Sequence, residues 1–210
     1  MGAAASRIPN ARRTEATTAR LIAVARRLFA ERGYARTATE DVAAAAEVTR
    51  GALYHHFKGK DALFEAVFLQ IQAEIGARIE AAGAAHTGLR PQIMAGCRAF
   101  LEMACEPDIR QIVLRDAPAV LGLEAWRLAD ERNATFRLRR SLAALDREQG
   151  GGRFDVEAMT VLLNGALNEA ATWIAQADDP AAALRRASAS FAELARALDV
   201  PRDAAPERAG

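Results

Sequence analysis

Apolar residues recur every three to four positions along almost the whole chain of 210 residues. A long example is the series Leu63, Val67, Ile71, Ile75 and Ile79. This spacing gathers apolar side chains on one face of an α-helix, whereas a half-buried β-strand would alternate apolar and polar residues. The sequence lacks such alternation of β-branched residues. It therefore predicts an all-α fold.

The composition is that of a packed protein. Hydrophobic residues make up 51% of the chain and charged residues 26%, which is enough to bury a core and excludes a wholly disordered chain. No apolar run approaches the roughly 18 residues that a membrane span needs. The opening stretch MGAAASRIPNARR also lacks the apolar centre of a signal peptide. We expect a soluble, cytoplasmic protein with no membrane partner.

Charge is distributed unevenly along the chain. Residues 1–60 contain eleven Lys and Arg against five Asp and Glu, and residues 61–210 contain seventeen against twenty-two. A basic N-terminal part joined to an acidic body suggests that the first part binds a polyanion. The alternative is an arginine-rich surface that only meets water.

Two short helices are predicted close together near residue 50. The first begins at Thr39, or is capped from Thr37 in a capping box, and ends near Ala46. Thr49 is a candidate N-cap for the second, so only two residues remain for the turn. Two helices joined by so tight a turn form a helix-turn-helix.

The second of these helices has an outer face suited to a DNA groove. Leu53 and Phe57 lie four residues apart and face inward, so Arg50 and Tyr54 face outward with His55. Arginine can donate to guanine O6 and N7, and histidine can donate or accept at a base edge. Tyrosine offers a hydroxyl to a phosphate. These residue types predict contacts to both bases and backbone.

The only two lysines of the chain, Lys58 and Lys60, follow this helix directly. A further helix is expected to begin at Asp61, so the Lys60 ammonium lies beside the unpaired N–H groups of that helix. An ammonium and a helix N-terminus together favour a phosphate.

The stretch TATEDVAAAAEVTRGALYHHFKGKDALFEAVF resembles the DNA-binding domain of the tetracycline-repressor (TetR) family, with a match from about Thr18 to Phe68. One departure is Glu47, which stands in the turn where the family usually has Gly. A left-handed backbone costs a non-glycine residue about 1 kcal/mol or more. The resemblance implies operator contacts by Thr39, Thr49, Arg50, Gly51, Ala52, Tyr54, His55 and Lys60.

We expect four segments on this basis. They are a disordered arm over residues 1–15, a three-helix DNA-binding domain over 16–62, a larger effector-binding and dimerisation domain over 63–200, and a disordered tail over 201–210. Arg7, Arg12 and Arg13 would suit a minor-groove arm, and a solvated tail is the alternative.

Two helices, over about 155–176 and 180–198, are expected to close the chain. The resemblance implies that they pair with their copies in a second subunit as a four-helix bundle. An ordinary core within one chain is the alternative. The broad apolar face of the first of them consists of Met159, Leu162, Leu163, Ala166, Leu167, Ala170 and Ile174.

The body between is expected to hold a pocket for a small-molecule effector. Aromatic and apolar side chains would form its wall, with two asparagines four residues apart as polar groups. Without a charged anchor, such a site favours a hydrophobic or amphipathic molecule. The candidates, each of which has the core as its alternative, are Phe68, Phe100, Met103, Trp126, Phe136, Asn164, Asn168 and Trp173.

The sequence favours neither an enzyme nor a metal or cofactor site. His55 and His56 are adjacent and point about 100° apart on a helix, with no third ligand nearby. The glycine run at 150–152 lacks the Gly-Lys-Ser/Thr that would hold a nucleotide. We therefore expect a homodimeric repressor that binds a palindromic operator and is released by a small molecule. The alternative is an architectural or global DNA-binding protein without a ligand.

Overall fold

The computed structural model describes residues 10–197, and these residues form helices joined by short turns, without a β-strand in that range. The all-α prediction is confirmed. The elements are α1 (Asn10–Arg32), α2 (Thr39–Ala45), α3 (Arg50–His56), α4 (Lys60–Ala84), α5 (Leu89–Met103), η1 (Ile109–Asp116), α6 (Ala117–Val120), α7 (Leu123–Asp130), η2 (Glu131–Thr135), α8 (Phe136–Glu148), α9 (Val156–Gln176) and α10 (Pro180–Ala197), where η marks a π-helix.

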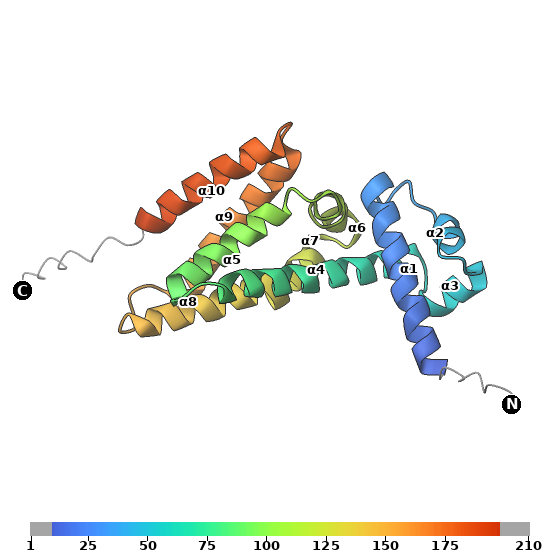
Figure 1. Ribbon diagram of the computed structural model, residues 1–210, viewed down its shortest axis with the longest axis horizontal. Coiled ribbons are helices and arrows are strands. Elements are labelled where there is room, and N and C mark those ends of the chain that lie inside the picture. The colour runs from blue at the N-terminus through green and yellow to red at the C-terminus, as the bar shows by residue number, and fades with distance from the viewer. Residues whose placement is uncertain (1–9, 198–210) are drawn as a thin grey trace, which may run out of the picture.

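The molecule has a small end and a large body that share one helix (Figure 1). Helices α1, α2 and α3 form the small end, and α4 runs from it along the whole body. Helix α5 packs along the far part of α4, and α8, α9 and α10 pack against α5 and around one another. Because α4 is continuous from Lys60 to Ala84, the small end and the body are parts of one framework.

Two hydrophobic clusters hold this arrangement together. The first joins α1–α4 to η1 and α7, and its fully buried centre includes Phe29, Phe64 and Phe68. The second joins α5 to α9 and α10 through residues such as Leu101 and Ile174. The apolar series on α4 lies in the first cluster, with Ile79 packed against its edge, as helical spacing requires.

The helix ends follow the local chemistry of the sequence. Gly33 has φ +76° directly after α1, the left-handed conformation expected of a glycine at a helix end. Thr37 does not cap α2: its hydroxyl donates to the carbonyls of Gly33 and Leu28, and α2 begins at Thr39. Pro118 stands in the first turn of α6, where its missing N–H costs nothing.

The predicted disordered arm differs from the structure over residues 10–15, which belong to α1. Ala, Arg and Glu in this stretch favour a helix, and Thr17 and Thr18 donate back to the carbonyls of Arg13 and Thr14. Arg7 and the predicted tail over 201–210 lie outside the described residues. No helix within residues 10–197 is both long and apolar enough to cross a membrane.

Candidate nucleic-acid interface and internal cavity

The turn between α2 and α3 is a complete Schellman motif centred on Glu47. Glu47 has φ +52°, the left-handed conformation that its position requires. Its N–H donates to the carbonyl of Ala44 at 3.1 Å, and the N–H of Val48 donates to that of Ala43 at 3.0 Å. These are the two hydrogen bonds that define the motif. The tight turn thus forms around a glutamate, which is exposed.

Helix α3 is fixed at both ends and along its inner face. The Thr49 hydroxyl accepts from the N–H of Ala52 at 3.1 Å, so Thr49 is the N-cap, as predicted. Leu53 is fully buried and Phe57 is 8% exposed, both in the first cluster. The opposite face of α3 consequently points to solvent.

The exposed edge holds most of the residues predicted to contact DNA. Thr49, Arg50, Gly51, Tyr54 and His55 are exposed, and Ala52 is half-buried. Arg50 lies 3.3 Å from the Glu40 carboxylate, and its guanidinium is 5.4 Å from the centre of the Tyr54 ring. Arg50 is therefore paired with an acidic side chain of α2.

Thr39 and His56 have partners inside this domain. Thr39 is 7% exposed, and its hydroxyl lies 3.3 Å from that of Tyr54. The His56 ring nitrogen Nδ1 lies 2.9 Å from the Thr18 hydroxyl, which ties α3 to α1. His56 is thus a structural residue, whereas His55 points outward.

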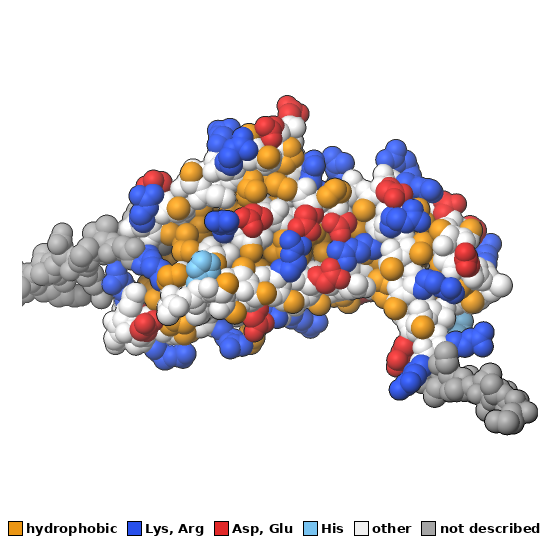
Figure 2. Space-filling model, viewed as in Figure 1, with side chains coloured by type: hydrophobic (Ala, Val, Ile, Leu, Met, Phe, Trp, Pro, Cys, Tyr) orange, Lys and Arg blue, Asp and Glu red, His pale blue; other side chains and the backbone are white. Residues whose placement is uncertain are grey.

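Lys60, the first residue of α4, is positioned by Tyr34. The Lys60 ammonium donates to the Tyr34 carbonyl at 2.8 Å and lies 4.1 Å from the centre of the Tyr34 ring. The Tyr34 hydroxyl donates to Asp61, and burial together with this bond raises the pKa of Tyr34 to about 12. Figure 2 shows Lys and Arg side chains over the end that α1–α3 form, with Asp and Glu among them.

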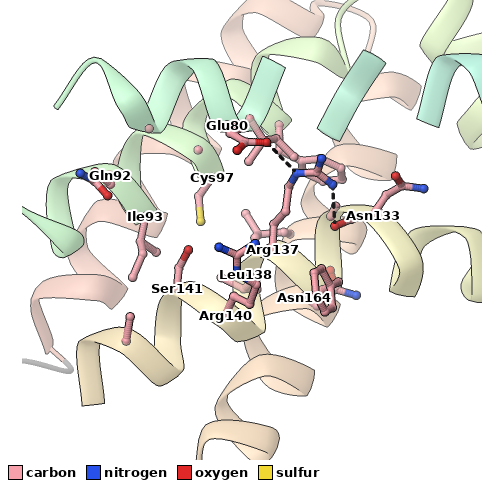
Figure 3. A pocket seen from close by; sticks show the side chains of 18 of the residues that line it. Glu80, Gln92, Ile93, Cys97, Asn133, Arg137, Leu138, Arg140, Ser141 and Asn164 are labelled. Atoms are coloured by element: carbon pink, nitrogen blue, oxygen red, sulfur yellow. Dashed lines mark hydrogen bonds and ion pairs between the residues drawn. The ribbon is translucent and has the colours of Figure 1, made fainter. Parts of the chain in front are cut away.

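A cavity of about 730 Å³ lies in the body, lined by the far part of α4 and by α5, η2, α8 and α9. Its volume is in the range of pockets that enclose a small molecule. Apolar wall comes from side chains such as Ile79, Ile93, Phe100 and Leu167. Figure 3 shows Arg137, Arg140 and Ser141 extending from α8, opposite Cys97 and Ile93 of α5.

The cavity has a basic side that the sequence analysis missed. Arg132, Arg137 and Arg140 line it, and among the described residues Glu80 is the only acid in the lining. A site without a charged anchor was expected from the sequence, whereas the lining of this cavity includes three arginines. A signal was present: Arg137, Arg140, Ser141 and Ala144 are spaced by three and four, which places them on one face of a helix. That face lines the cavity, which the sequence alone did not show.

Arg137 packs against α4 because residue 76 is glycine. A Cβ atom at Gly76 would lie 2.8 Å from Nη1 and 2.9 Å from Cζ of Arg137. Gly76 is buried in the middle of α4, where glycine costs helix stability relative to alanine. Its lack of a side chain leaves the space that the guanidinium occupies.

The predicted pocket residues separate into three groups. Phe100, Phe136 and Asn164 line the large cavity. Met103, Trp126 and Asn168, again with Phe100, line a much smaller one of about 20 Å³. Phe68 and Trp173 line neither of these cavities. Phe68 is 1% exposed in the first cluster, and Trp173 lies on the outer surface with Arg186 over its ring. Phe68 faces the core because it shares the inward stripe of α4.

A buried carboxylate joins the two cavities. Asp130 is 6% exposed, and one of its oxygens accepts from the Thr135 hydroxyl and from the side-chain amides of Asn164 and Asn168, at 3.0 to 3.1 Å. Asn164 lines the large cavity, and Asn168 and Asp130 line the small one. The two asparagines are therefore already engaged within the protein.

The apolar face predicted on the long helix α9 is divided by the fold. Leu163, Leu167 and Ile174 are buried in their own chain because α5, α8 and α10 pack on that side, so they are not available to a partner. Leu162 and Ala166 are exposed, and Met159 and Ala170 are half-buried. A surface groove between α9 and α10, lined by residues such as Ala166, Trp173 and Phe191, continues this outer face.

Within the described part of the chain, no three His, Cys, Asp or Glu side chains gather as metal ligands would. Cys97 and Cys105 are both free thiols. Burial raises the pKa of Cys97 to about 12, so this thiol stays protonated at neutral pH.

The fold and the exposed face of α3, the recognition helix of the helix-turn-helix, define a DNA-binding transcriptional regulator. Two family models match the chain: bacterial regulatory proteins of the tetR family over residues 21–67, and the tetracyclin repressor-like C-terminal domain over residues 91–198. The chain belongs to the TetR family of transcriptional regulators. Its resemblance to that family, first seen near residue 50, is confirmed over both parts.

Individual relatives agree with this assignment. The crystal structure of a TetR-family transcriptional regulator from Pectobacterium atrosepticum is 40% identical, with a TM-score of 0.79, over 90% of this chain and 97% of that one. The regulator AcrR of Shigella flexneri is 42% identical over 60 residues, which are 29% of this chain and 28% of AcrR. TtgR of Pseudomonas putida is 49% identical over 51 residues, 24% of each chain. The match to these curated relatives thus spans about a quarter of their length.

Proposed function

We propose that this protein is a homodimeric repressor that binds a palindromic operator and leaves it when a small molecule enters the internal cavity. One observation carries the proposal. A single helix, α4, begins at Lys60 on the exposed edge of the DNA-binding domain and lines the cavity with Ile79, Glu80 and Gly83 in its last turns. A ligand that moves the far part of α4 would move the edge as well.

The DNA contacts follow from the geometry of α3. We assign Arg50 and His55 to base edges in the major groove. We assign Thr49, Tyr54 and Lys60 to the DNA backbone. Gly51 allows close approach because it has no side chain, and Ala52 is small enough for the same purpose. Thr39 is 7% exposed, so its contact to a phosphate would depend on the hydrogen bond between its hydroxyl and that of Tyr54.

The second subunit is proposed to cover the outer face of α9 and α10. Val161, Leu162, Trp173 and Leu194 are 62%, 69%, 41% and 46% exposed in the single chain, which is unusual for such large apolar side chains. A second copy would bury them in an isologous interface. Dimerisation would also give the two recognition helices that a palindromic site requires.

Release follows if the ligand prefers one arrangement of α4. Two recognition helices must lie about 34 Å apart, or a multiple of this, to enter successive major grooves on one side of DNA. A ligand that stabilises a different separation weakens DNA binding by its difference in affinity for the two arrangements. By the same linkage, DNA must weaken ligand binding equally.

The experiment is to select bound fragments from the source genome with the purified protein and to compare the selected site with random duplex. A repressor of this kind prefers its site by about 10³-fold or more. Equal affinity for both duplexes would favour the alternative, an architectural DNA-binding protein. Small molecules are then screened for release of the selected site, and the absence of any releasing compound would again favour that alternative.

A further inference from the structure

The protein neutralises the arginines of the cavity only in part. Among the charged lining residues, Arg132, Arg137 and Arg140 outnumber the single Glu80 by two charges. Within residues 10–197, Arg132 and Arg140 have no hydrogen bond or ion pair. A cavity with excess positive charge beside low-dielectric walls attracts an anion.

Arg137 has only distant partners. Its Nε lies 3.6 Å from the Glu80 carboxylate, and its Nη1 lies 3.4 Å from the Asn133 carbonyl (Figure 3). Both distances exceed the 2.7–2.9 Å that is usual for charge-assisted hydrogen bonds. The Glu80 side chain is 73% exposed, so it can turn to water when another acceptor arrives.

Arg139 on the same helix is an example of an arginine with close acidic partners. Its Nε and Nη2 donate to the two carboxylate oxygens of Glu157 at 2.8 and 3.0 Å, and Glu131 lies 3.6 Å away. Arg139 does not line the cavity. Arg139, outside the cavity, thus has two close acidic contacts, whereas the three arginines of the cavity share the one distant contact from Glu80 to Arg137.

The side of the cavity formed by α5 and α9 is uncharged and mostly apolar, with Gln92 and Asn164 as its polar side chains. Ile93, Cys97 and Phe100 of α5 and Leu167 of α9 line it. Because the Cys97 thiol stays protonated at neutral pH, it adds no negative charge there. A molecule that fills this cavity would meet guanidinium groups at one side and hydrocarbon at the other.

We propose that the cavity binds an amphipathic organic acid, with its carboxylate on Arg137 and Arg140 and its apolar part against α5 and α9. A guanidinium offers paired N–H donors that match the two oxygens of a carboxylate. This inference rests on the proposed function, because it specifies the class of molecule that releases the operator.

Isothermal titration calorimetry with two matched pairs tests the inference. The probes are decanoate against decanamide and 1-naphthylacetate against 1-naphthylacetamide, which differ within each pair only in the charged group. At least one acid is expected to bind about tenfold to a hundredfold more tightly than its amide, as hydrogen bonds between charged groups predict. Equal binding of acid and amide in both pairs, or no binding by any probe, would overturn the inference.

Arginine variants locate the effect. Arg140→Gln and Arg137→Gln should each remove most of the preference for the acid while leaving the amide unchanged. Arg147→Gln, on the same helix and outside the cavity lining, is the matched control and should keep the preference. Arg140 is exposed, so its variant keeps the test valid if Arg137→Gln folds poorly. A preference that persists in both cavity variants would place the acid elsewhere and overturn the inference.

The operator separates this inference from the proposed function. Acids that bind through Arg137 and Arg140 without weakening operator binding would leave the inference standing and refute release by a ligand. A neutral compound could bind in the cavity and release the operator while neither acid binds. That result would support the proposed function and refute the inference that the ligand is an organic acid.

Discussion

The backbone N–H of Tyr34 donates to the carboxylate of Asp116, with 2.7 Å between nitrogen and Oδ2. Tyr34 follows α1 of the DNA-binding domain, and Asp116 is the last residue of η1 in the body. The Tyr34 carbonyl accepts from Lys60 at the same time. One residue therefore connects the body, through its N–H, to the cation at the start of α4, through its carbonyl.

Asp116→Ala should lower the free energy of unfolding by about 1–3 kcal/mol, because the N–H of the half-buried Tyr34 loses a charged acceptor. Asp116→Asn keeps an acceptor oxygen in place and should lower the free energy of unfolding clearly less. Urea denaturation of both variants measures the difference. Equal losses for Ala and Asn would mean that the hydrogen bond itself contributes nothing measurable.

Arg50→Ala and Lys60→Ala should differ in kind when operator binding is measured against salt concentration. Arg50→Ala is expected to cost about 1–3 kcal/mol at one base pair and to relax the preference there. Lys60→Ala should weaken all duplexes alike and reduce the salt slope by about one. If Arg50→Ala weakened selected and random duplex equally, Arg50 would be a backbone contact instead.

Glu47→Gly should stabilise the protein by about 0.5–1 kcal/mol. Glycine removes the cost of a left-handed backbone at a residue with a side chain, which is about 1–2 kcal/mol. Part of this gain is offset because glycine also makes the unfolded chain more flexible. Glu47→Ala removes the same charge but keeps the strain, so it is the control and should give little stabilisation. Thermal unfolding of the pair separates backbone strain from charge, and an equal gain in both variants would point to charge.

Leu162→Arg should convert the proposed dimer into folded monomers, because the arginine would place an unpaired charge in the subunit interface. Leu69→Arg is the matched control, because Leu69 is an exposed leucine on α4. The exposed fraction is 48% for Leu69 and 69% for Leu162. Sedimentation velocity distinguishes the two species. A dimer that survives in Leu162→Arg, or a monomeric parent protein, would contradict the proposed face.

Cys97 should make the protein less stable in alkali. Its pKa is about 12 in the folded protein against 9.0 for the unshifted thiol, because burial disfavours the thiolate. The folded value is the higher one, so this contribution is complete below pH 9 and is lost as the pH rises toward 12. Within this window the free energy of unfolding should fall by about 1.4 kcal/mol per pH unit. Cys97→Ala should have a clearly shallower slope than the parent protein, because only the contributions of other groups such as Tyr34 remain. Cys105→Ala should keep most of the parent's slope, and equal slopes in all three proteins would refute the assignment.

The DNA-binding end was predictable because its signals are local. Gly33 after α1, Thr49 before α3 and the inward pair Leu53 and Phe57 each act within a few residues. Even the left-handed backbone at Glu47 follows from the tightness of the turn. The match to a known family added the roles of residues that spacing alone leaves open.

The cavity was less predictable because it depends on which helix faces converge. Phe68 and Trp173 have the same chemistry as Phe100, but one faces the core and the other faces solvent. Arg137 and Arg140 resemble ordinary surface arginines in the sequence, and Gly76 resembles a weak point in a helix. Their meaning appears only when α8 lies against α4.

The continuity of α4 limits which insertions and deletions the chain can accept. In an α-helix each residue turns the next by about 100° and advances it by about 1.5 Å. Inserting or deleting one residue between Lys60 and Ile79 would therefore rotate the two ends of α4 out of phase, although every residue type would be preserved. The number of residues between these two positions is then as constrained as their identities, and length changes in the family should fall in the loops around this helix and not within it.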